Sequence, residues 1–165
     1  MTEVRDINCA DVTATVKKLF LEANTSLGED VRNALQKAQE SEVSELGRYV
    51  LDQILENVAL AKETGEPLCQ DTGIAVVFLE VGQDVHIIGG NLYDAVSAGI
   101  RQAYAEGYLR KSVCDPLTRA NTTDNLPAVI YTDIVPGNRL KIIAMPKGGG
   151  SENMSGTAML VPAAG

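Results

Sequence analysis

The chain has 165 residues, of which 45% are hydrophobic, and a formal net charge of −8. A chain of this length and apolar content can bury a substantial core, and we expect one domain over residues 1–165. The acidic charge and an aromatic content of only 4% argue against nucleic-acid binding, which needs a basic surface. No apolar run reaches the roughly 18 residues of a membrane span, so no membrane contact is expected. Three cysteines, an odd number without paired spacing, indicate a reducing compartment, by default the cytoplasm.

Apolar residues recur at helical spacing through the first third of the chain. This spacing predicts three helices between Cys9 and Lys62, with Gly28 separating the first two and acidic residues suited to the start of the second. The apolar stripes are typical of core-facing helices: Val12, Val16, Leu19 and Phe20; Val31, Ala34, Leu35 and Ala38; Leu46, Val50, Leu51, Ile54, Leu55 and Val58.

A compact polar run follows the third predicted helix: Pro67-Leu68-Cys69-Gln70-Asp71-Thr72-Gly73. It places a thiol, an amide, a carboxylate and a hydroxyl between turn-forming residues, and a strand-like run follows it. Loops between rigid elements are where ligands usually bind. Thiolates are preferred by iron–sulfur clusters, zinc and copper(I). Taken alone, however, an isolated cysteine of this kind is more often a buried thiol beside an Asx-type turn.

Strand-like runs dominate the rest of the chain, over residues 74–81, 85–88, 128–135 and 140–145. A helix is predicted from Leu92 to Glu106, with Asn91 as its N-cap. The turn formed by Pro136, Gly137 and Asn138 predicts an antiparallel hairpin of the last two strands. Together the elements predict an α+β fold: N-terminal helices followed by a mainly antiparallel sheet with packed helices.

A glycine-rich run follows the last predicted strand: Lys147-Gly148-Gly149-Gly150-Ser151-Glu152-Asn153-Met154-Ser155. Three consecutive glycines leave backbone amides uncovered, and such amides can form an anion-binding concavity with Lys147 at its edge. The run is not a P-loop, because the lysine precedes the glycines. The alternative is a flexible linker, although linkers are rarely interrupted by Lys, Glu, Asn and Met so close together.

Four spaced segments occur in one order: Cys69-Gln70-Asp71-Thr72-Gly73, Gly107-Tyr108-Leu109-Arg110-Lys111-Ser112, Asn121-Thr122-Thr123-Asp124-Asn125-Leu126-Pro127-Ala128, and the glycine-rich run. Together they resemble the class I, iron–sulfur-dependent fumarate hydratases. The resemblance includes the two-subunit enzymes, whose alpha subunit begins this way, and their L-tartrate dehydratase relatives. It covers the chain from Glu3 to Gly165.

The resemblance implies a hydro-lyase that holds a 4Fe-4S cluster with three cysteines and leaves one iron open to substrate. It assigns Cys69 as the first ligand, while the other two ligands of the family lie beyond Gly165. Cys9 and Cys114 occupy no family ligand position and are interpreted as packing or incidental thiols. We therefore expect an N-terminal part of an alpha subunit that is inactive alone. Its expected partners are the rest of that subunit and a beta subunit or C-terminal domain, in an oligomer.

The resemblance also implies roles for individual residues toward a dicarboxylate substrate, either fumarate and malate or tartrate. Asp71 is the candidate for acid chemistry, and Gln70 for a polar substrate contact. Arg110 suits one carboxylate as a planar donor. Three further residues are candidates for the opposite end of the substrate: Lys147, Gly149 and Gly150.

One segment departs from the family pattern Asn-Thr-Gly-Asp-Asn-Thr-Pro-Ala. Thr123 replaces the glycine and Leu126 replaces the second threonine. If the glycine of the family has a positive φ, Thr123 is strained. Fumarate and tartrate differ only by hydroxyls, so the sequence leaves both open as substrates. A non-catalytic assembly module, with the acidic helical half serving subunit contacts, is the alternative from another class.

Overall fold

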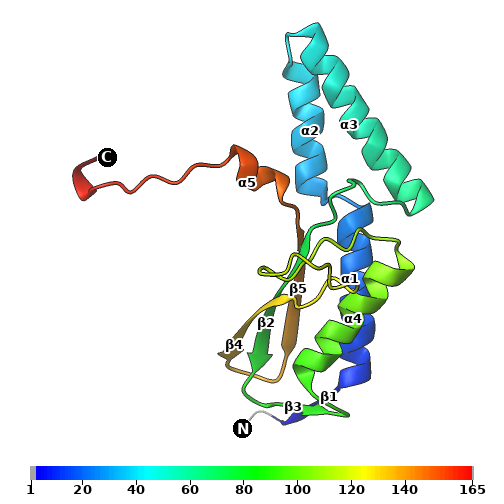
Figure 1. Ribbon diagram of the computed structural model, residues 1–165, viewed down its shortest axis with the longest axis vertical. Coiled ribbons are helices and arrows are strands. Elements are labelled where there is room, and N and C mark those ends of the chain that lie inside the picture. The colour runs from blue at the N-terminus through cyan, green and yellow to red at the C-terminus, as the bar shows by residue number, and fades with distance from the viewer. Residues whose placement is uncertain (1–2, 165) are drawn as a thin grey trace.

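The computed structural model of the chain describes residues 3–164. In chain order its elements are β1 (Arg5–Asn8), α1 (Cys9–Thr25), α2 (Glu29–Ser41), α3 (Glu45–Thr64), β2 (Ile74–Gly82), β3 (Val85–Ile88), α4 (Leu92–Glu106), β4 (Val129–Val135), β5 (Leu140–Lys147), α5 (Gly150–Met154) and the 3-10 turn Pro162–Ala164. Figure 1 shows a body built from α1, α4 and the strands, from which a hairpin of α2 and α3 projects. Within residues 3–164, no helix is both long enough and apolar enough to cross a membrane.

The core fills the space between the three-stranded sheet and the helices α1 and α4. Every second residue at the start of β2 is buried there, as strand geometry requires: Ala75, Val77 and Leu79. Val12, Val16 and Phe20 of the stripe predicted on α1 form the opposite side of this core, together with Val96, Ile100, Ala103 and Tyr104 of α4. Their two aromatic rings, Phe20 and Tyr104, meet at a centroid distance of 6.1 Å. The α+β class is confirmed.

The strand pairing is mixed, where a mainly antiparallel sheet was expected. The three-stranded sheet has the order β4-β2-β5, with β2 parallel to β4 and antiparallel to β5. A separate parallel pair joins β1 to β3, and β1 is a strand that its mostly polar sequence did not indicate. The long apolar run of β2 therefore has a hydrogen-bonded partner on both edges.

The predicted hairpin between β4 and β5 is wrong, because β2 lies between these strands. The turn after β4 crosses the end of β2, and the Gln83 amide donates to Val135 O at 2.8 Å. Gly82 makes room for this crossing, since a Cβ there would lie 2.4 Å from Gly137 O. The turn residues were recognised correctly from sequence, but they join two strands that flank a third.

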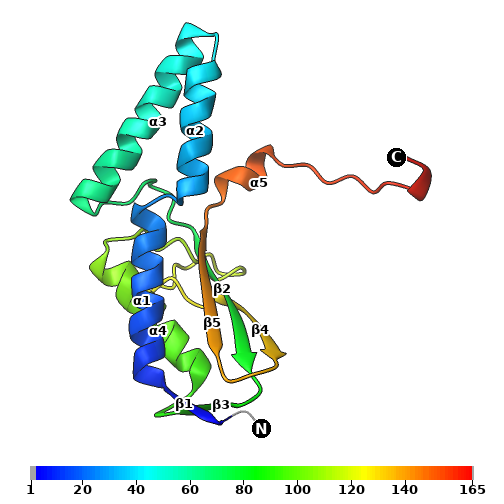
Figure 2. The same cartoon turned by 180° about the vertical axis from the view of Figure 1, so that it is seen from behind.

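The α2–α3 hairpin has the predicted helices but not the predicted burial. Figure 2 shows the two helices lying beside each other, away from the sheet. α2, every residue of which the structure describes, has no buried side chain, and α3 buries only Val58 and Ala61. Leu46 is 72% exposed. The prediction that these two stripes belong to the core is wrong, because each helix packs mainly on its partner and not on the sheet.

Candidate functional site

The Cys-Gln-Asp-Thr-Gly loop connects α3 to β2 and is anchored on both sides. The Leu68 amide donates to Asn24 O at 2.8 Å, and Asn57 Nδ2 donates to Leu68 O at 2.9 Å. At the other end of the loop, the Thr72 hydroxyl donates to Arg110 O at 2.9 Å. The loop is therefore fixed where the chain leaves the α2–α3 hairpin and enters the body.

Asp71 joins this loop to the glycine-rich run after β5. Its Oδ1 accepts from Gly73 N at 3.1 Å, and its Oδ2 accepts from Gly149 N at 2.8 Å. Gly73 permits this close approach, because its φ is +67° and an added Cβ would lie 2.2 Å from Lys147 O. A side chain at position 73 would push the two segments apart.

Arg110 lies at the border of two depressions. One, of about 390 Å³, is lined also by Asp71, and the other, of about 610 Å³, by Cys69. Ser112, which lines the first, has a buried hydroxyl without a hydrogen-bond partner among the described residues. The other predicted residues found in these linings are Lys147 and Gly149 in the first and Gln70 in the second. The structure thus brings five predicted residues around one arginine.

The guanidinium of Arg110 has no ion-pair partner among residues 3–164. Its two acidic neighbours in sequence are engaged elsewhere: Glu106 pairs with Lys17, and Asp115 accepts from the Thr118 amide at 2.7 Å. Hydrogen bonds from the Thr118 amide, the Thr118 hydroxyl and a further amide hold the pKa of the Asp115 carboxyl below its ordinary value. Neither acid neutralises Arg110, so its charge is available to an anionic ligand.

Lys147 and the glycine-rich run differ from Arg110, because they are bonded within the chain. Lys147 Nζ lies 2.8 Å from Glu152 Oε1, and the Gly149 amide is the one that Asp71 accepts. Gly150 begins the short helix α5 and is exposed. A substrate bound here as expected would have to replace the existing bonds of Lys147 and Gly149.

Two buried polar residues support these loops, and sequence reasoning gave neither a role in the site. The Tyr104 hydroxyl donates to Thr72 O at 2.8 Å, and burial raises its pKa to about 12. Asn125 Nδ2 donates to Gly73 O at 3.1 Å, and its Oδ1 accepts from Ser112 N at 2.8 Å. The available signals were a tyrosine on an otherwise aliphatic helix face and the second asparagine of the Asn-Thr-x-Asp-Asn segment, since buried polar groups need partners.

The segment that departs from the family pattern has left-handed backbone. Thr123 has a φ of 69° and Asn125 a φ of 62°. Asparagine tolerates this region, whereas a β-branched residue is strained in it, so the expected strain at Thr123 is confirmed. The Thr123 amide donates to Asn121 Oδ1 at 2.7 Å, and Asp124 pairs with Arg101 at 3.2 Å. These contacts hold the strained residue in place.

The three cysteines are free and lie in different surroundings. Cys9 is buried in the core, as expected of a packing thiol, and Cys114 is exposed with its Sγ 3.6 Å from Ser112 O. Cys69 is exposed beside the Arg110 depression. Among residues 3–164, no group of three or more His, Cys, Asp or Glu side chains could hold a metal. An exposed thiol such as that of Cys69 is the kind of donor that an iron–sulfur cluster takes.

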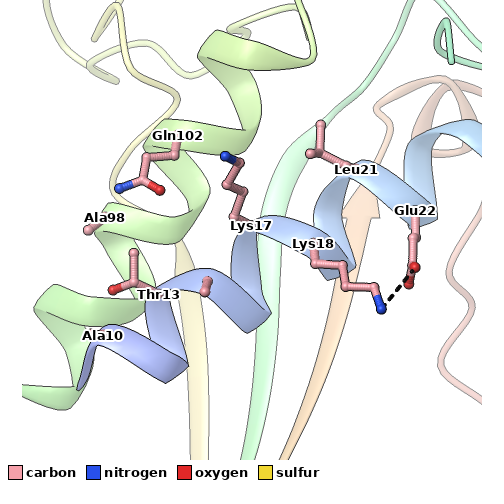
Figure 3. Close-up of a pocket in the computed structure, with 9 residues that line it drawn as sticks. Ala10, Thr13, Lys17, Lys18, Leu21, Glu22, Ala98 and Gln102 are labelled. Carbon is pink, nitrogen blue, oxygen red and sulfur yellow. Dashed lines mark ion pairs between the residues drawn. The ribbon is translucent and has the colours of Figure 1, made fainter. Parts of the chain in front are cut away.

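A larger depression, of about 740 Å³, lies between α1 and α4 and contains none of the predicted site residues. Figure 3 shows that its lining comes from the outer surfaces of these two helices, with Lys18 directed toward Glu22. Lys18 Nζ lies 3.6 Å from Glu22 Oε1, and both side chains are exposed. The depression is a groove between two packed helices, and its two lysines, Lys17 and Lys18, are paired with Glu106 and Glu22, so the candidate site remains the one around Arg110.

Comparison with known proteins assigns the family. The family model described as fumarate hydratase matches residues 13–165. The chain belongs to this family. A Methanocaldococcus jannaschii protein named "Putative L(+)-tartrate dehydratase subunit alpha" is 41% identical over 160 residues, covering 93% of this chain and 56% of that protein. The anaerobic class I fumarate hydratase of Escherichia coli K12 is 39% identical over 115 residues, covering 68% of this chain and 21% of the enzyme.

A further relative, the L(+)-tartrate dehydratase alpha subunit of Escherichia coli UTI89, is 26% identical over 159 residues, which cover 52% of that subunit. This member of the fumarate hydratase family thus spans about half the length of the two tartrate dehydratase alpha subunits that it matches. It spans 21% of the class I fumarate hydratase. The family inferred from the four sequence segments is confirmed.

Proposed function

We propose that this chain is the N-terminal part of an iron–sulfur hydro-lyase that interconverts fumarate and L-malate. The observation that carries the proposal is the position of Arg110, which borders both the depression of Asp71 and that of Cys69. A hydro-lyase acting on a small dicarboxylate needs three groups within reach of one molecule: a hydrogen-bond donor to a substrate carboxylate, a proton-transfer group and a metal ligand. Membership of the fumarate hydratase family supports the same reaction.

In this proposal, each residue acts on one part of the substrate. Arg110 binds one carboxylate through two parallel N–H donors, which fixes both the position and the plane of that group. Asp71 transfers a proton in the adjoining depression, and the hydrogen bond from the Gly73 amide orients its carboxylate. Gln70 supplies a polar contact. The far end of the substrate is assigned to Lys147 and the glycine-rich run, which exchange their present bonds for the ligand.

Cys69 would hold one corner of the 4Fe-4S cluster. When bound, the cluster supplies an open iron that acts as a Lewis acid toward the substrate hydroxyl. The other two thiolates and the proton-abstracting residue are assigned to the rest of the alpha subunit and to a beta subunit or C-terminal domain, in an oligomer. The chain, one domain by this proposal, is inactive without them. Its three free thiols suit a reducing compartment such as the cytoplasm.

The second candidate is the alpha subunit of an L-tartrate dehydratase, which the 41% identity over 93% of the chain favours. A different class of function, a non-catalytic assembly module, is favoured by the exposed apolar stripe of the α2–α3 hairpin. The experiment below separates all three.

Anaerobic reconstitution with iron and sulfide tests the proposal. We expect the chain alone to retain no stable cluster and to show no turnover, because one thiolate does not replace three. Together with the remaining polypeptides of the enzyme, it should give a brown protein that converts fumarate to malate. Turnover of tartrate without fumarate would select the second candidate. A complete assembly with neither iron nor turnover would leave the assembly module, and fumarate conversion by the isolated chain, with contaminating enzyme excluded, would contradict the division of ligands.

A further inference from the structure

We propose that Tyr104 and Asn125 form a buried clamp that sets the position of Asp71 relative to Arg110. This inference rests on the function proposed above. Neither clamp residue lines the two depressions around Arg110. Both therefore act through the backbone that they hold, and they are positioning residues.

The first arm of the clamp runs from the core to the Cys-Gln-Asp-Thr-Gly loop. The ring of Tyr104 packs near Phe20, and the residue is 0% exposed. Its hydroxyl donates to Thr72 O at 2.8 Å, with Gly73 O at 3.3 Å. Thr72 follows Asp71 directly, and its own hydroxyl donates to Arg110 O at 2.9 Å. A single bond from the core thus constrains the backbone beside both functional residues.

The second arm is the side chain of Asn125, which is also 0% exposed. Its Nδ2 donates to Gly73 O at 3.1 Å, while its Oδ1 accepts from Ser112 N at 2.8 Å and Val113 N at 3.1 Å. Gly73 lies two residues after Asp71, and Ser112 lies two residues after Arg110. The amide group of Asn125 therefore connects the segment of Asp71, the proposed proton-transfer residue, to the segment of Arg110, which is proposed to bind the substrate carboxylate.

Among residues 3–164, no other side chain bonds the Thr72 carbonyl or the Ser112 and Val113 amides. Removal of the Tyr104 hydroxyl takes the side-chain donor from Thr72 O, and removal of the Asn125 amide group takes the shared acceptor from the Ser112 and Val113 amides. Because buried backbone groups are almost always paired, each segment would shift to recover a partner. A displacement of about 1 Å in a reacting group can cost about a hundredfold in rate.

Kinetics of the assembled enzyme provide the first test. Tyr104→Phe should lower kcat about tenfold at normal iron content, because Thr72 adjoins the proton-transfer residue. The matched control is Tyr93→Phe on the same helix, whose hydroxyl lies 3.0 Å from Thr132 Oγ1 outside the site and should leave kcat unchanged. Asn125→Ala should mainly raise KM, since the segment it releases follows Arg110. A general loss of stability would not produce this division between kcat and KM.

Amide hydrogen exchange on the chain itself provides a second test that needs no reaction. In Tyr104→Phe, exchange should quicken at Gly73 and Gly149, whose amides donate to Asp71. In Asn125→Ala, it should quicken at Ser112 and Val113. The control for the asparagine change is the turn variant Asn138→Ala, which loses only a bond to Glu3 O.

Equal exchange at Gly73 and Gly149 in Tyr104→Phe and in Tyr93→Phe would overturn the clamp. Faster exchange with kinetics equal to the control would show that the loops move without affecting the reaction, and would overturn the positioning role. Tyr104→Phe keeps the ring, so it decides the matter even if Asn125→Ala fails to fold. The exchange result also stands if the assembled enzyme proves not to be a hydro-lyase, which separates failure of the clamp from failure of the proposed function.

Discussion

The body and the α2–α3 hairpin are built from similar amphipathic helices, and their apolar residues have opposite fates. Ile100, on α4 in the body, is 0% exposed, whereas Leu46, on α3 in the hairpin, is 72% exposed. The difference lies in the surface that each stripe meets. α1 and α4 pack on a sheet with a broad apolar face, while α2 and α3 pack mainly on each other (Figure 1). Helical periodicity thus predicts a helix, and burial depends on whether a second apolar surface is present.

The candidate site lies at the boundary between these two regions, and the body determines its geometry. The loop of Asp71 follows α3, but the bonds that hold Thr72 and Gly73 come from Tyr104 on α4 and from Asn125. If this division is correct, changes in the body should alter the site or the stability of the fold. Changes on the exposed apolar stripe of the hairpin should alter neither.

The largest expected effect concerns Cys69, which lies on the loop at this boundary. In the assembled enzyme, Cys69→Ser should abolish cluster retention, because a serine oxygen is a poor replacement for thiolate on iron. Cys114→Ser is the matched control, since that thiol is also exposed. Iron and sulfide content per protein measures the outcome. Unchanged iron in Cys69→Ser, or lost iron in Cys114→Ser, would show that the cluster is held elsewhere.

Next in size is the difference in stability between matched leucine changes. Leu79→Ala removes a fully buried side chain and should lower the free energy of unfolding by about 2–5 kcal/mol. Leu46→Ala removes an exposed one and should change it by less than about 0.5 kcal/mol. Urea titration of the two variants at the same protein concentration gives both values. An equal loss would mean that Leu46 is buried against a partner surface in solution.

The fold could be predicted from sequence wherever the deciding interactions are local. Periodicity located the four long helices and the strands β2 to β5 but not β1, and Asn91 was recognised as the cap that accepts from the Tyr93 amide. The β4–β5 pairing was wrong because β4 pairs with a strand from much earlier in the chain: Phe78 on β2 lies beside Tyr131, 53 positions later. No local turn signal carries that information.

The site divides in the same way. Side chains such as Asp71 and Arg110 stand in short segments whose residue types indicate chemistry, so sequence alone could nominate them. Tyr104 and Asn125 act on backbone carbonyls 32 and 52 positions away, respectively. A hydrogen bond to a backbone carbonyl makes no demand on residue type at the accepting position, so the sequence holds no pattern for it.

A smaller effect on stability is expected at high pH and comes from Tyr104. Burial raises the pKa of its hydroxyl from 10.0 to about 12 in the folded chain, so the folded state holds this proton more tightly than the unfolded state. The contribution of this proton to the free energy of unfolding is fully present below pH 10.0 and is lost as the pH rises through about 12. The loss amounts to about 2–3 kcal/mol. Urea unfolding across this range should show that decline in the wild type and not in Tyr104→Phe, and identical pH profiles would contradict it.

The smallest effect expected concerns substrate binding. It depends on the Arg110 guanidinium having no ion-pair partner among residues 3–164. Arg110→Lys keeps the positive charge but removes the planar pair of donors, so kcat/KM in the assembled enzyme should fall about tenfold through KM, with normal iron content. Asp71→Asn should instead lower kcat, because it removes the ionisable group and preserves the shape. Arg139→Lys, in the turn between β4 and β5, is the control for the arginine change.

The alternative for Arg110 is a surface ion pair, in which lysine would serve nearly as well as arginine. Exposed pairs contribute little, about 0–1 kcal/mol, so Arg110→Lys would then change neither kinetic constant. The structure argues against this alternative, because Glu106 is paired with Lys17 and Asp115 accepts from its own turn. Kinetic constants equal to those of Arg139→Lys would nevertheless remove Arg110 from the site. A rise in KM alone would locate one substrate carboxylate on the body side of the boundary, between Asp71 and Cys69.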